Sequence, residues 1–425
     1  MAANGLSRTL SDALPQHAQV VIIGGGIVGC SVAWHLTKLN CTEVVLLERR
    51  QLGSGTTWHS AGNIIRMDCS PAMMEIYRYG AELCAEIERE TGQAVGWRNC
   101  GRVMVARTRE RMAEFERIAA AGKAAATEVD FVTPREIAEK LPLMRTDDLL
   151  GGLWSPGDGR VNPTDLLTAY ARGARSRGAL LVENTEVSDI STRNNRVSGV
   201  VTPEGEIGCE LVVNCAGLWT RHLGLRHDVS IPLYPTEHFY LLTAPIDGID
   251  PMMPTFRDPD GLVYGREEVG GLLFGCFDRN AKPIDPMSLP GNFAFSLLDE
   301  DWEQFGPYML EGIHRIPALE HAGVRTLLNG PESFTPDGSP VVGEAPNLKG
   351  YFVLAGMCSS GITTSAGLGR ILASWIVDGE PGVDISRFDI GRFSTEQNEE
   401  SWLREQVRHV PSGHFGAATK APKIL

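Results

Sequence analysis

Residues 19–48 read QVVIIGGGIVGCSVAWHLTKLNCTEVVLLE, and this stretch decides the fold. It opens with a continuous apolar run at 19–23, as expected for a strand that is buried on both faces. Glycines in GxGxxG spacing follow, then apolar side chains at helical intervals over 27–39, then a second apolar run that ends at Glu48. Strand, glycine turn, helix and strand within about 30 residues predict a βαβ unit that binds a dinucleotide.

Each glycine of this motif has a physical role. Gly24 permits the tight turn, Gly26 lets the backbone approach a pyrophosphate, and Gly29 allows the helix to pack closely on the strand. The pyrophosphate sits at the helix N-terminus, where free N–H groups and the helix dipole favour an anion. The carboxylate of Glu48 can accept hydrogen bonds from a ribose diol. This spacing predicts a dinucleotide but does not separate FAD from NAD.

Composition excludes several other classes of protein. The chain has 425 residues and a formal net charge of −14, with no run rich in Lys or Arg, so nucleic acid or an anionic membrane is not expected as a partner. No apolar run approaches the ~20 residues that a membrane span needs. The nine Cys residues are scattered without metal-type spacing, so no metal site is predicted. The first 17 residues contain one Arg and no apolar core, which argues against a secretory signal and predicts a cytoplasmic location, or the mitochondrial matrix in a eukaryote.

Further elements of nucleotide-binding type are predicted in the middle and at the end of the chain. Helices are expected at 72–90, 108–122, 164–177, 292–318 and 365–379, and strands at 179–184, 196–217, 350–356 and within 231–277. The predicted fold is α/β, with a Rossmann-type domain built from discontinuous segments and an inserted α+β substrate domain that contains a large mixed or antiparallel sheet. The first domain takes residues 18–85, 146–230 and 328–382; the second takes 86–145 and 231–327; a polar tail at 383–425 wraps the surface.

The segment ERRQLGSGTTWHSAG (48–62) resembles the flavin domain of the sarcosine dehydrogenase and dimethylglycine dehydrogenase (oxidase) family, in the D-amino-acid-oxidase-like superfamily. The similarity continues through ETGQAVGW (90–97), LPLM (141–144), GGLWSPGDGRVNP (151–163), VVNCAGLW (212–219), GPESFTPDGSPVVGEAP (330–346) and DISRFDIGRF (384–393). It covers nearly the whole chain and implies that the Rossmann-type domain binds FAD. The expected cofactor contacts are Gly24, Gly26, Ile27, Val28, Gly29, Glu48, Arg49, Thr56, Thr57, His59, Val187, Trp219, Gly361, Ile362 and Thr363.

The resemblance also implies a covalent flavin. Family members join a His of the TWH or TSH motif to the 8α-methyl carbon of the flavin, and the matching residue is His59. A neutral imidazole nitrogen is a competent nucleophile towards that carbon. The more distant sarcosine oxidases use a Cys a few residues before a TPD-like motif instead. The corresponding position here is about Gly330, so the Cys route is absent.

On the substrate side, the resemblance implies His238 and Tyr264 as acid/base candidates near the flavin. Arg66 occupies the place where sarcosine oxidases present an Arg to the substrate carboxylate, and a guanidinium can bind a carboxylate through two parallel hydrogen bonds. Those oxidases also use a Lys where this sequence has Thr363. The carboxylate is therefore expected to be held differently, or to lie farther from the amine.

The implied reaction is oxidative N-demethylation of a secondary or tertiary N-methyl amine or amino acid. Hydride passes to flavin N5, and hydrolysis of the iminium releases formaldehyde, with O₂ or an electron-transfer flavoprotein as the electron acceptor. Two alternatives stay open: an amine or amino-acid oxidase that attacks the α-carbon, and a non-catalytic regulatory flavoprotein. Longer family members continue into a folate-binding half, so the tail at 383–425 is interpreted as the remnant of a linker to that half.

Overall fold

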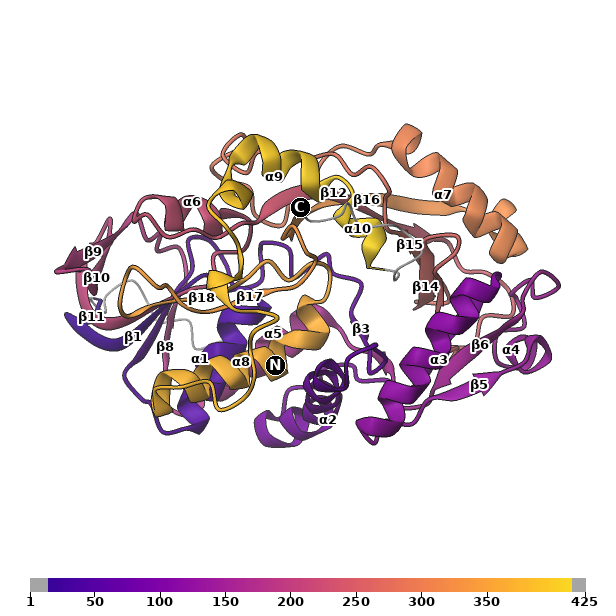
Figure 1. The fold of residues 1–425 in the computed structure, drawn as a ribbon, viewed down its shortest axis with the longest axis horizontal. Coiled ribbons are helices and arrows are strands. Elements are labelled where there is room, and N and C mark those ends of the chain that lie inside the picture. Colours follow the sequence, from indigo (N-terminus) through magenta and orange to yellow (C-terminus); the bar gives the residue numbers. More distant parts are fainter. Residues whose placement is uncertain (1–13, 415–425) are drawn as a thin grey trace, which may run out of the picture.

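The computed structural model describes residues 14–414, and two eight-stranded sheets dominate it. Figure 1 shows the first sheet on the left and the second on the right; helices α1, α8, α5 and α2 lie towards the bottom, and α6, α9 and α7 along the top. Within the described part, the α/β architecture agrees with the prediction from the sequence.

The first sheet is of the Rossmann type. Its strand order is β17–β18–β11–β1–β2–β8, with β10 and β9 extending from β11. Strands β18, β11, β1, β2 and β8 run parallel, whereas β17 and the β9–β10 hairpin are antiparallel to their neighbours. The strands are β1 (His17–Ile23), β2 (Val44–Leu47), β8 (Leu180–Val182), β9 (Asp189–Arg193), β10 (Arg196–Thr202), β11 (Gly205–Asn214), β17 (Val341–Glu344) and β18 (Tyr351–Ala355).

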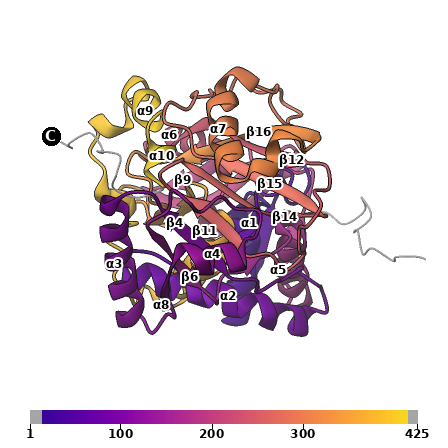
Figure 2. The ribbon, with the colours of Figure 1, turned by 90° about the vertical axis from the view of Figure 1, so that its right-hand side faces the viewer.

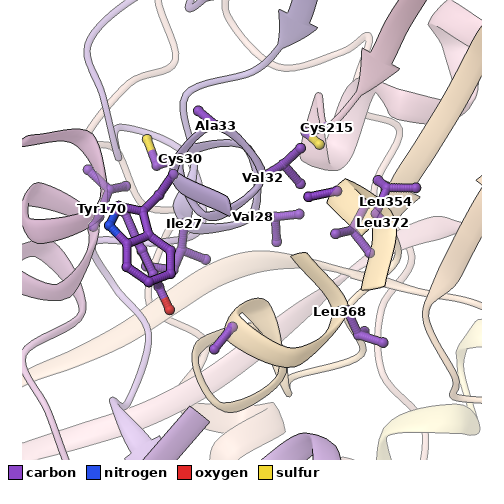
Figure 3. Close-up of a cluster of buried hydrophobic side chains, with 14 of the residues drawn as sticks. Ile27, Val28, Cys30, Val32, Ala33, Tyr170, Cys215, Leu354, Leu368 and Leu372 are labelled. Atoms are coloured by element: carbon purple, nitrogen blue, oxygen red, sulfur yellow. The ribbon is translucent and has the colours of Figure 1, made fainter. Parts of the chain in front are cut away.

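Strand β1 is apolar over its last four residues, 20–23, because both faces of that part are covered. Val20 and Ile22 point into a core formed with helices α1 (Ile27–Lys38), α5 (Pro163–Ser176) and α8 (Gly361–Asp378). Val21 and Ile23 point into a second core, which the β9–β10 hairpin covers. Figure 3 shows the helix side of this arrangement, where side chains from α1, α5 and α8 meet. Of the run predicted at 19–23, residues 20–23 have the double burial that their composition indicates, whereas Gln19 is exposed.

The second sheet is mostly antiparallel and has the order β16–β12–β15–β14–β13–β4–β6–β5. Only β13 and β4 pair in parallel. Its strands are β4 (Arg102–Ala106), β5 (Asp130–Val132), β6 (Gly151–Ser155), β12 (Tyr234–Thr243), β13 (Thr255–Asp258), β14 (Val263–Glu268), β15 (Gly271–Cys276) and β16 (Val324–Phe334). A separate two-stranded ribbon joins β3 (Asn63–Ile64) to β7 (Gly159–Arg160).

Helices α4 (Pro134–Lys140) and α7 (Trp302–Arg315) cover one face of this sheet, as Figure 2 shows. Alternate residues of β12 serve the two faces: Phe239 packs into the core with Phe305 of α7, whereas His238 points to the opposite face. The remaining helices are α2 (Pro71–Thr91), α3 (Arg109–Ala124), α6 (Thr220–Leu225), α9 (Glu400–Val407) and α10 (Val410–Gly413), with short 3₁₀ turns η1 (Gly217–Trp219), η2 (Pro317–Glu320), η3 (Ile390–Arg392) and η4 (Glu396–Asn398).

Two predicted helices have different starts in the structure. The helix predicted at 292–318 begins only at Trp302, where Asp301 caps it by accepting a hydrogen bond from the N–H of Gln304. Residues before the cap use their N–H groups elsewhere; that of Phe295, for example, donates to the carbonyl of Ser54. Helix α8 begins at Gly361, four residues before the predicted start at 365.

The prediction of a polar tail on the surface is wrong for part of the segment after residue 383. Helix α9 packs against β12 and buries Leu403 and Val407, which share one helix face because they are four residues apart. The chain then turns through α10 and brings His414 to the cavity described below. The rest of the predicted tail, 415–425, and most of the N-terminal segment examined for a secretory signal, 1–13, lie outside the described residues.

The predicted domain boundaries at 146 and 328 do not coincide with the division between the sheets. Strand β6 (Gly151–Ser155) and residues 328–334 of β16 belong to the second sheet.

No helix between residues 14 and 414 has both the length and the apolar character that crossing a bilayer requires. In the same range, no three His, Cys, Asp or Glu side chains gather in a way that could hold a metal ion.

Candidate active site

A cavity of about 650 Å³ lies where the two sheets meet. Its lining includes Ile23 and Leu47 at the carboxyl ends of β1 and β2, the place where open α/β sheets bind ligands. Residues of the second sheet form the other wall. Of the predicted site residues, those that line the cavity are Gly24, Gly26, Ile27, Val28, Glu48, Arg49, Thr56, Thr57, His59, Val187, Trp219, His238, Tyr264, Gly361, Ile362 and Thr363.

The glycine turn has the geometry that its motif requires. Gly24 has φ +107°, a backbone conformation that side-chain-bearing residues rarely adopt. Gly29 does not line the cavity; a Cβ there would lie 2.0 Å from the carbonyl oxygen of Gly24. Gly29 therefore serves the close packing of helix on strand, as its place in the motif predicts, and its direct contact with a cofactor stays a prediction.

Two side chains from neighbouring segments hold the turn in place. The hydroxyl oxygen of Thr57 accepts a hydrogen bond from the N–H of Ile27, at 3.0 Å, at the first position of α1. The carboxylate of Glu48 accepts hydrogen bonds from the N–H groups of Gly25 (2.7 Å) and Arg50 (2.8 Å). Burial raises the pKa of Glu48 above its ordinary value, and these two hydrogen bonds oppose that rise.

A cation–aromatic pair closes one end of the cavity. The guanidinium of Arg49 lies 3.5 Å from the centroid of the Trp219 ring. The indole N–H of Trp219 donates to the carbonyl of Pro286, which fixes the orientation of the ring. This flat, amphipathic wall suits a planar heterocycle.

His59 is buried in the cavity wall against Gly330. A Cβ on Gly330 would lie 2.4 Å from both Nδ1 and Cε1 of the His59 ring, so only glycine leaves room for the imidazole. Burial, with a smaller contribution from His238, lowers the pKa of His59 to about 4. The ring is therefore neutral at pH 7 and keeps a nitrogen lone pair.

The register of the second sheet brings the predicted acid/base candidates to one face. His238 on β12 lies opposite Gly330 on β16, and Tyr264 on β14 lies opposite Gly275 on β15. Both side chains line the cavity and flank the ring of Phe277, at centroid distances of 4.9 Å for His238 and 5.6 Å for Tyr264. Burial lowers the pKa of His238 to about 4 and raises that of Tyr264, so both side chains are neutral at pH 7.

The structure does not place Arg66 on the cavity. Its backbone N–H donates to Asp158, and its guanidinium packs against Gly157, where a Cβ would lie 2.8 Å from Nη1. Thr363 does line the cavity, but its hydroxyl is bonded to the backbone N–H and carbonyl of Ile65. The prediction that Arg66 faces the substrate carboxylate is therefore not supported by its position.

Among the other arginines that line the cavity, two come from the second sheet and had no signal in the sequence. Arg102 on β4 donates to Thr255 at 3.0 Å and lies 3.5 Å from Asp158. Arg257 is on the adjacent strand β13, and burial, together with the nearby charge of Arg102, lowers its pKa to about 9. Two guanidinium groups on neighbouring strands of the cavity wall favour an anionic ligand group beside them.

Glu332 and His414 also line the cavity, and neither was predicted from the sequence. Glu332 lies on β16, two residues from Gly330 and on the same face. His414 comes from the C-terminal segment and stacks on Phe277, with ring centroids 4.5 Å apart and an interplanar angle of 13°. No local sequence pattern marks either residue, because strand pairing and the path of the tail bring them to the cavity.

The cavity residues fit a flavin dinucleotide. The glycine turn would hold the pyrophosphate, and Glu48 could accept hydrogen bonds from a ribose. The Arg49–Trp219 wall could stack against the adenine, and the surroundings of His59 could hold the ring system of the flavin. A Rossmann-type sheet joined to a mostly antiparallel sheet, with the cavity between them, defines a flavin-dependent oxidoreductase.

Comparison with known proteins makes the assignment specific. Residues 19–375 match the family "DAO: FAD dependent oxidoreductase", and the chain belongs to that family. The fold is similar to that of L-proline dehydrogenase from P. horikoshii, with a TM-score of 0.80, 25% sequence identity, and coverage of 89% of this chain and 98% of that one.

Three curated relatives are similar over most of the chain. Human mitochondrial sarcosine dehydrogenase is 40% identical over 96% of this chain and 44% of its own length. The mouse mitochondrial pyruvate dehydrogenase phosphatase regulatory subunit is 38% identical over 94% of this chain and 46% of its own length. The formaldehyde-forming 4-methylaminobutanoate oxidase of Paenarthrobacter nicotinovorans is 36% identical over 96% and 49%. The chain thus spans a little under half the length of each of these relatives.

Proposed function

We propose that the protein catalyses the oxidative N-demethylation of an N-methyl amine or amino acid and releases formaldehyde. The observation that carries the proposal is the convergence of His59, His238 and Tyr264 on the cavity that begins at the glycine turn. The similarity to enzymes named for sarcosine and 4-methylaminobutanoate supports an N-methyl substrate. Bound FAD would supply the acceptor for a hydride from the N-methyl carbon.

The protein's own residues orient and polarise the substrate. Phe277 and Tyr264 offer an apolar surface to the N-methyl group, and burial excludes water from the reacting carbon. The amine has to be neutral when hydride leaves, because an ammonium has no lone pair to assist. A cavity group must therefore accept the ammonium proton, and the sequence predicts His238 in that role.

The anionic end of the substrate would bind at Arg257 and Arg102. Both guanidinium groups lie on adjacent strands of the cavity wall, and a carboxylate there would form charge-assisted hydrogen bonds. This arrangement replaces the predicted role of Arg66. The electron acceptor, O₂ or an electron-transfer flavoprotein, and the location of the protein stay predictions from the sequence.

We also propose that His59 is the covalent anchor of the flavin. Its neutral imidazole and the glycine at 330 that makes room for it support this role. Acid precipitation of the purified protein tests it: flavin should stay in the pellet for wild type and move to the supernatant for His59→Ala. Flavin in the wild-type supernatant would exclude the bond and leave the fold assignment intact.

A second candidate, a non-catalytic regulatory flavoprotein, is favoured by the similarity to the phosphatase regulatory subunit. Anaerobic mixing with N-methyl amines separates the two. An enzyme bleaches its flavin absorbance and releases formaldehyde, whereas a regulatory protein shows neither. Bleaching without formaldehyde would instead indicate oxidation at the α-carbon.

A further inference from the structure

Glu332 is a buried carboxylate on the cavity wall that the reaction scheme above does not use. Strand pairing sets Glu332 opposite Thr236 and Gly330 opposite His238, so Glu332 shares the face of the sheet that carries His238. Its Oε2 atom lies 3.8 Å from Nε2 of His238. Both atoms are buried, and within residues 14–414 neither has a hydrogen-bond partner.

The surroundings give this carboxylate little compensation for burial. Ser359 donates hydrogen bonds to Glu332 from its backbone and side chain, and these oppose the rise in pKa that burial causes. In the described residues, the basic group within 4.0 Å of the Glu332 carboxylate is the imidazole of His238. This imidazole is neutral at pH 7 because burial lowers its pKa to about 4. A buried carboxylate without a cation is costly, so this position favours a ligand that brings a positive charge.

We propose that Glu332 binds the ammonium group of the substrate and accepts its proton, and that the Glu332–His238 pair selects secondary N-methyl amines over tertiary ones. This inference rests on the proposed function. A secondary ammonium carries two N–H bonds, one for Oε2 of Glu332 and one for Nε2 of His238 when that nitrogen carries no proton. A tertiary ammonium carries one and leaves one of the two acceptors without a donor.

The proton balance is simple. The ammonium and the Glu332 carboxylate become a neutral amine and a carboxylic acid, with no bond to carbon formed or broken. Burial raises the pKa of Glu332 to about 7, and loss of water on binding lowers the pKa of the ammonium. Desolvation therefore narrows the difference between the two pKa values, while the attraction between the two charges opposes the transfer. A base with a pKa near the working pH is more effective than the imidazole of His238, whose conjugate acid is too strong. His238 then acts as a hydrogen-bond acceptor that positions the amine.

Binding to dithionite-reduced, flavin-loaded protein tests the ammonium site without turnover. The probes are sarcosine and (methylthio)acetate, its thioether counterpart, which has neither charge nor proton on the central atom. Glu332→Gln should lower the affinity for sarcosine by roughly 10-fold or more, as expected for loss of a charge-assisted hydrogen bond. It should change the affinity for the thioether by less than about twofold. Glu237→Gln is the matched control. Glu237 immediately precedes His238, but its side chain lies on the other face of the sheet, where it accepts a hydrogen bond from the side-chain amide of Asn329. This substitution should leave both affinities unchanged.

Stopped-flow reduction of the oxidised enzyme tests the proton transfer. With a secondary amine, Glu332→Gln should slow flavin reduction by ~10²–10⁴-fold and remove the rise in rate through pH 7. Glu332→Asp, which keeps the carboxylate and serves if the Gln variant does not fold, should retain that pH dependence at a lower rate. In wild type, secondary amines should reduce the flavin faster than the matching tertiary amines.

The outcomes separate the two proposals. Equal loss of sarcosine and thioether affinity, or a wild-type pH profile in Glu332→Gln, would overturn the role of Glu332 while N-demethylation by the wild type still stands. A wild type that binds sarcosine through Glu332 but never bleaches would refute the proposed function alone. A wild type that binds neither probe would overturn the ammonium site.

Discussion

At the scale of single residues, the contact of His59 with Gly330 decides how a flavin can be attached. The ring occupies the space in which any side chain at 330 would lie. A covalent tether from the position of Gly330, as in the sarcosine oxidases, and an imidazole at 59 therefore exclude each other sterically. The presence of glycine at 330 follows from the presence of histidine at 59.

Gly330→Ala tests this contact. The added methyl group should displace His59, so the fraction of flavin that remains bound after acid precipitation should fall by more than half, and the thermal unfolding midpoint should drop. Gly306→Ala is the control, because a Cβ on Gly306 in α7 would meet no atom within 4 Å. Normal flavin content in Gly330→Ala would show that the ring has room to move.

At the scale of elements, the pairing of β13 with β4 and β14 builds the proposed carboxylate subsite. Arg257→Met should raise the substrate concentration for half-maximal flavin reduction by roughly 10- to 100-fold, because a hydrogen bond to a charged group contributes about 1.5–3 kcal/mol. The effect should be absent for an N-methyl amine without a carboxylate. Equal weakening of both kinds of amine would contradict the subsite.

Helix α9 offers a test of how the C-terminal segment supports the cavity. Leu403 is fully buried with Tyr234 and Phe334, two residues from β12 and β16. Leu403→Ala should lower the free energy of unfolding by about 2–5 kcal/mol, measured by chemical denaturation of the flavin-loaded protein. Arg404→Ala changes the exposed neighbour and should have little effect. A loss for Leu403→Ala below about 0.5 kcal/mol would show that α9 is not part of the cooperative fold.

The elements differ in how far the sequence predicts them. The βαβ unit was predictable because strand, turn and helix signals are local and consecutive within residues 19–48. The opposite wall was only partly predictable: the resemblance led to His238 and Tyr264, but Glu332, Arg102 and Arg257 become neighbours only through strand pairing. The position of His414 depends on the packing of α9, for which the sequence gives only the spacing of two apolar residues.

At the scale of the whole molecule, buried histidines link stability to pH. Burial lowers the pKa of His35 from 6.5 to about 3, so the unfolded chain takes up a proton below pH 6.5 that the folded chain refuses until about pH 3. The contribution of His35 is complete above pH 6.5 and is lost as the pH falls, with a slope of about 1.4 kcal/mol per pH unit. Glu332 has the opposite effect because burial raises its pKa to about 7. Its contribution to stability increases as the pH falls from 7 towards the pKa of glutamate in the unfolded chain.

The substitution His35→Gln isolates the contribution of this histidine to the pH dependence of the free energy of unfolding. The variant removes the titrating group but keeps Glu332, so the contribution of the carboxyl cancels in the comparison. Between pH 6 and pH 4 the free energy of unfolding of wild type should fall more steeply than that of the variant, by about 1.4 kcal/mol per pH unit. Parallel curves from denaturant titrations at each pH would show that His35 is protonated in the folded protein.

The distribution of the cavity along the chain has a consequence for biosynthesis. The glycine turn is complete after residue 29, but the adjacent strands β11 and β18 end at Asn214 and Ala355, and His414 comes later still. These segments emerge from the ribosome in chain order, so the glycine turn is synthesised long before the strands that lie beside it. Capture of the cofactor is therefore expected only after residues up to His414 have been synthesised, and shortage of riboflavin should leave unfilled chains exposed to proteases.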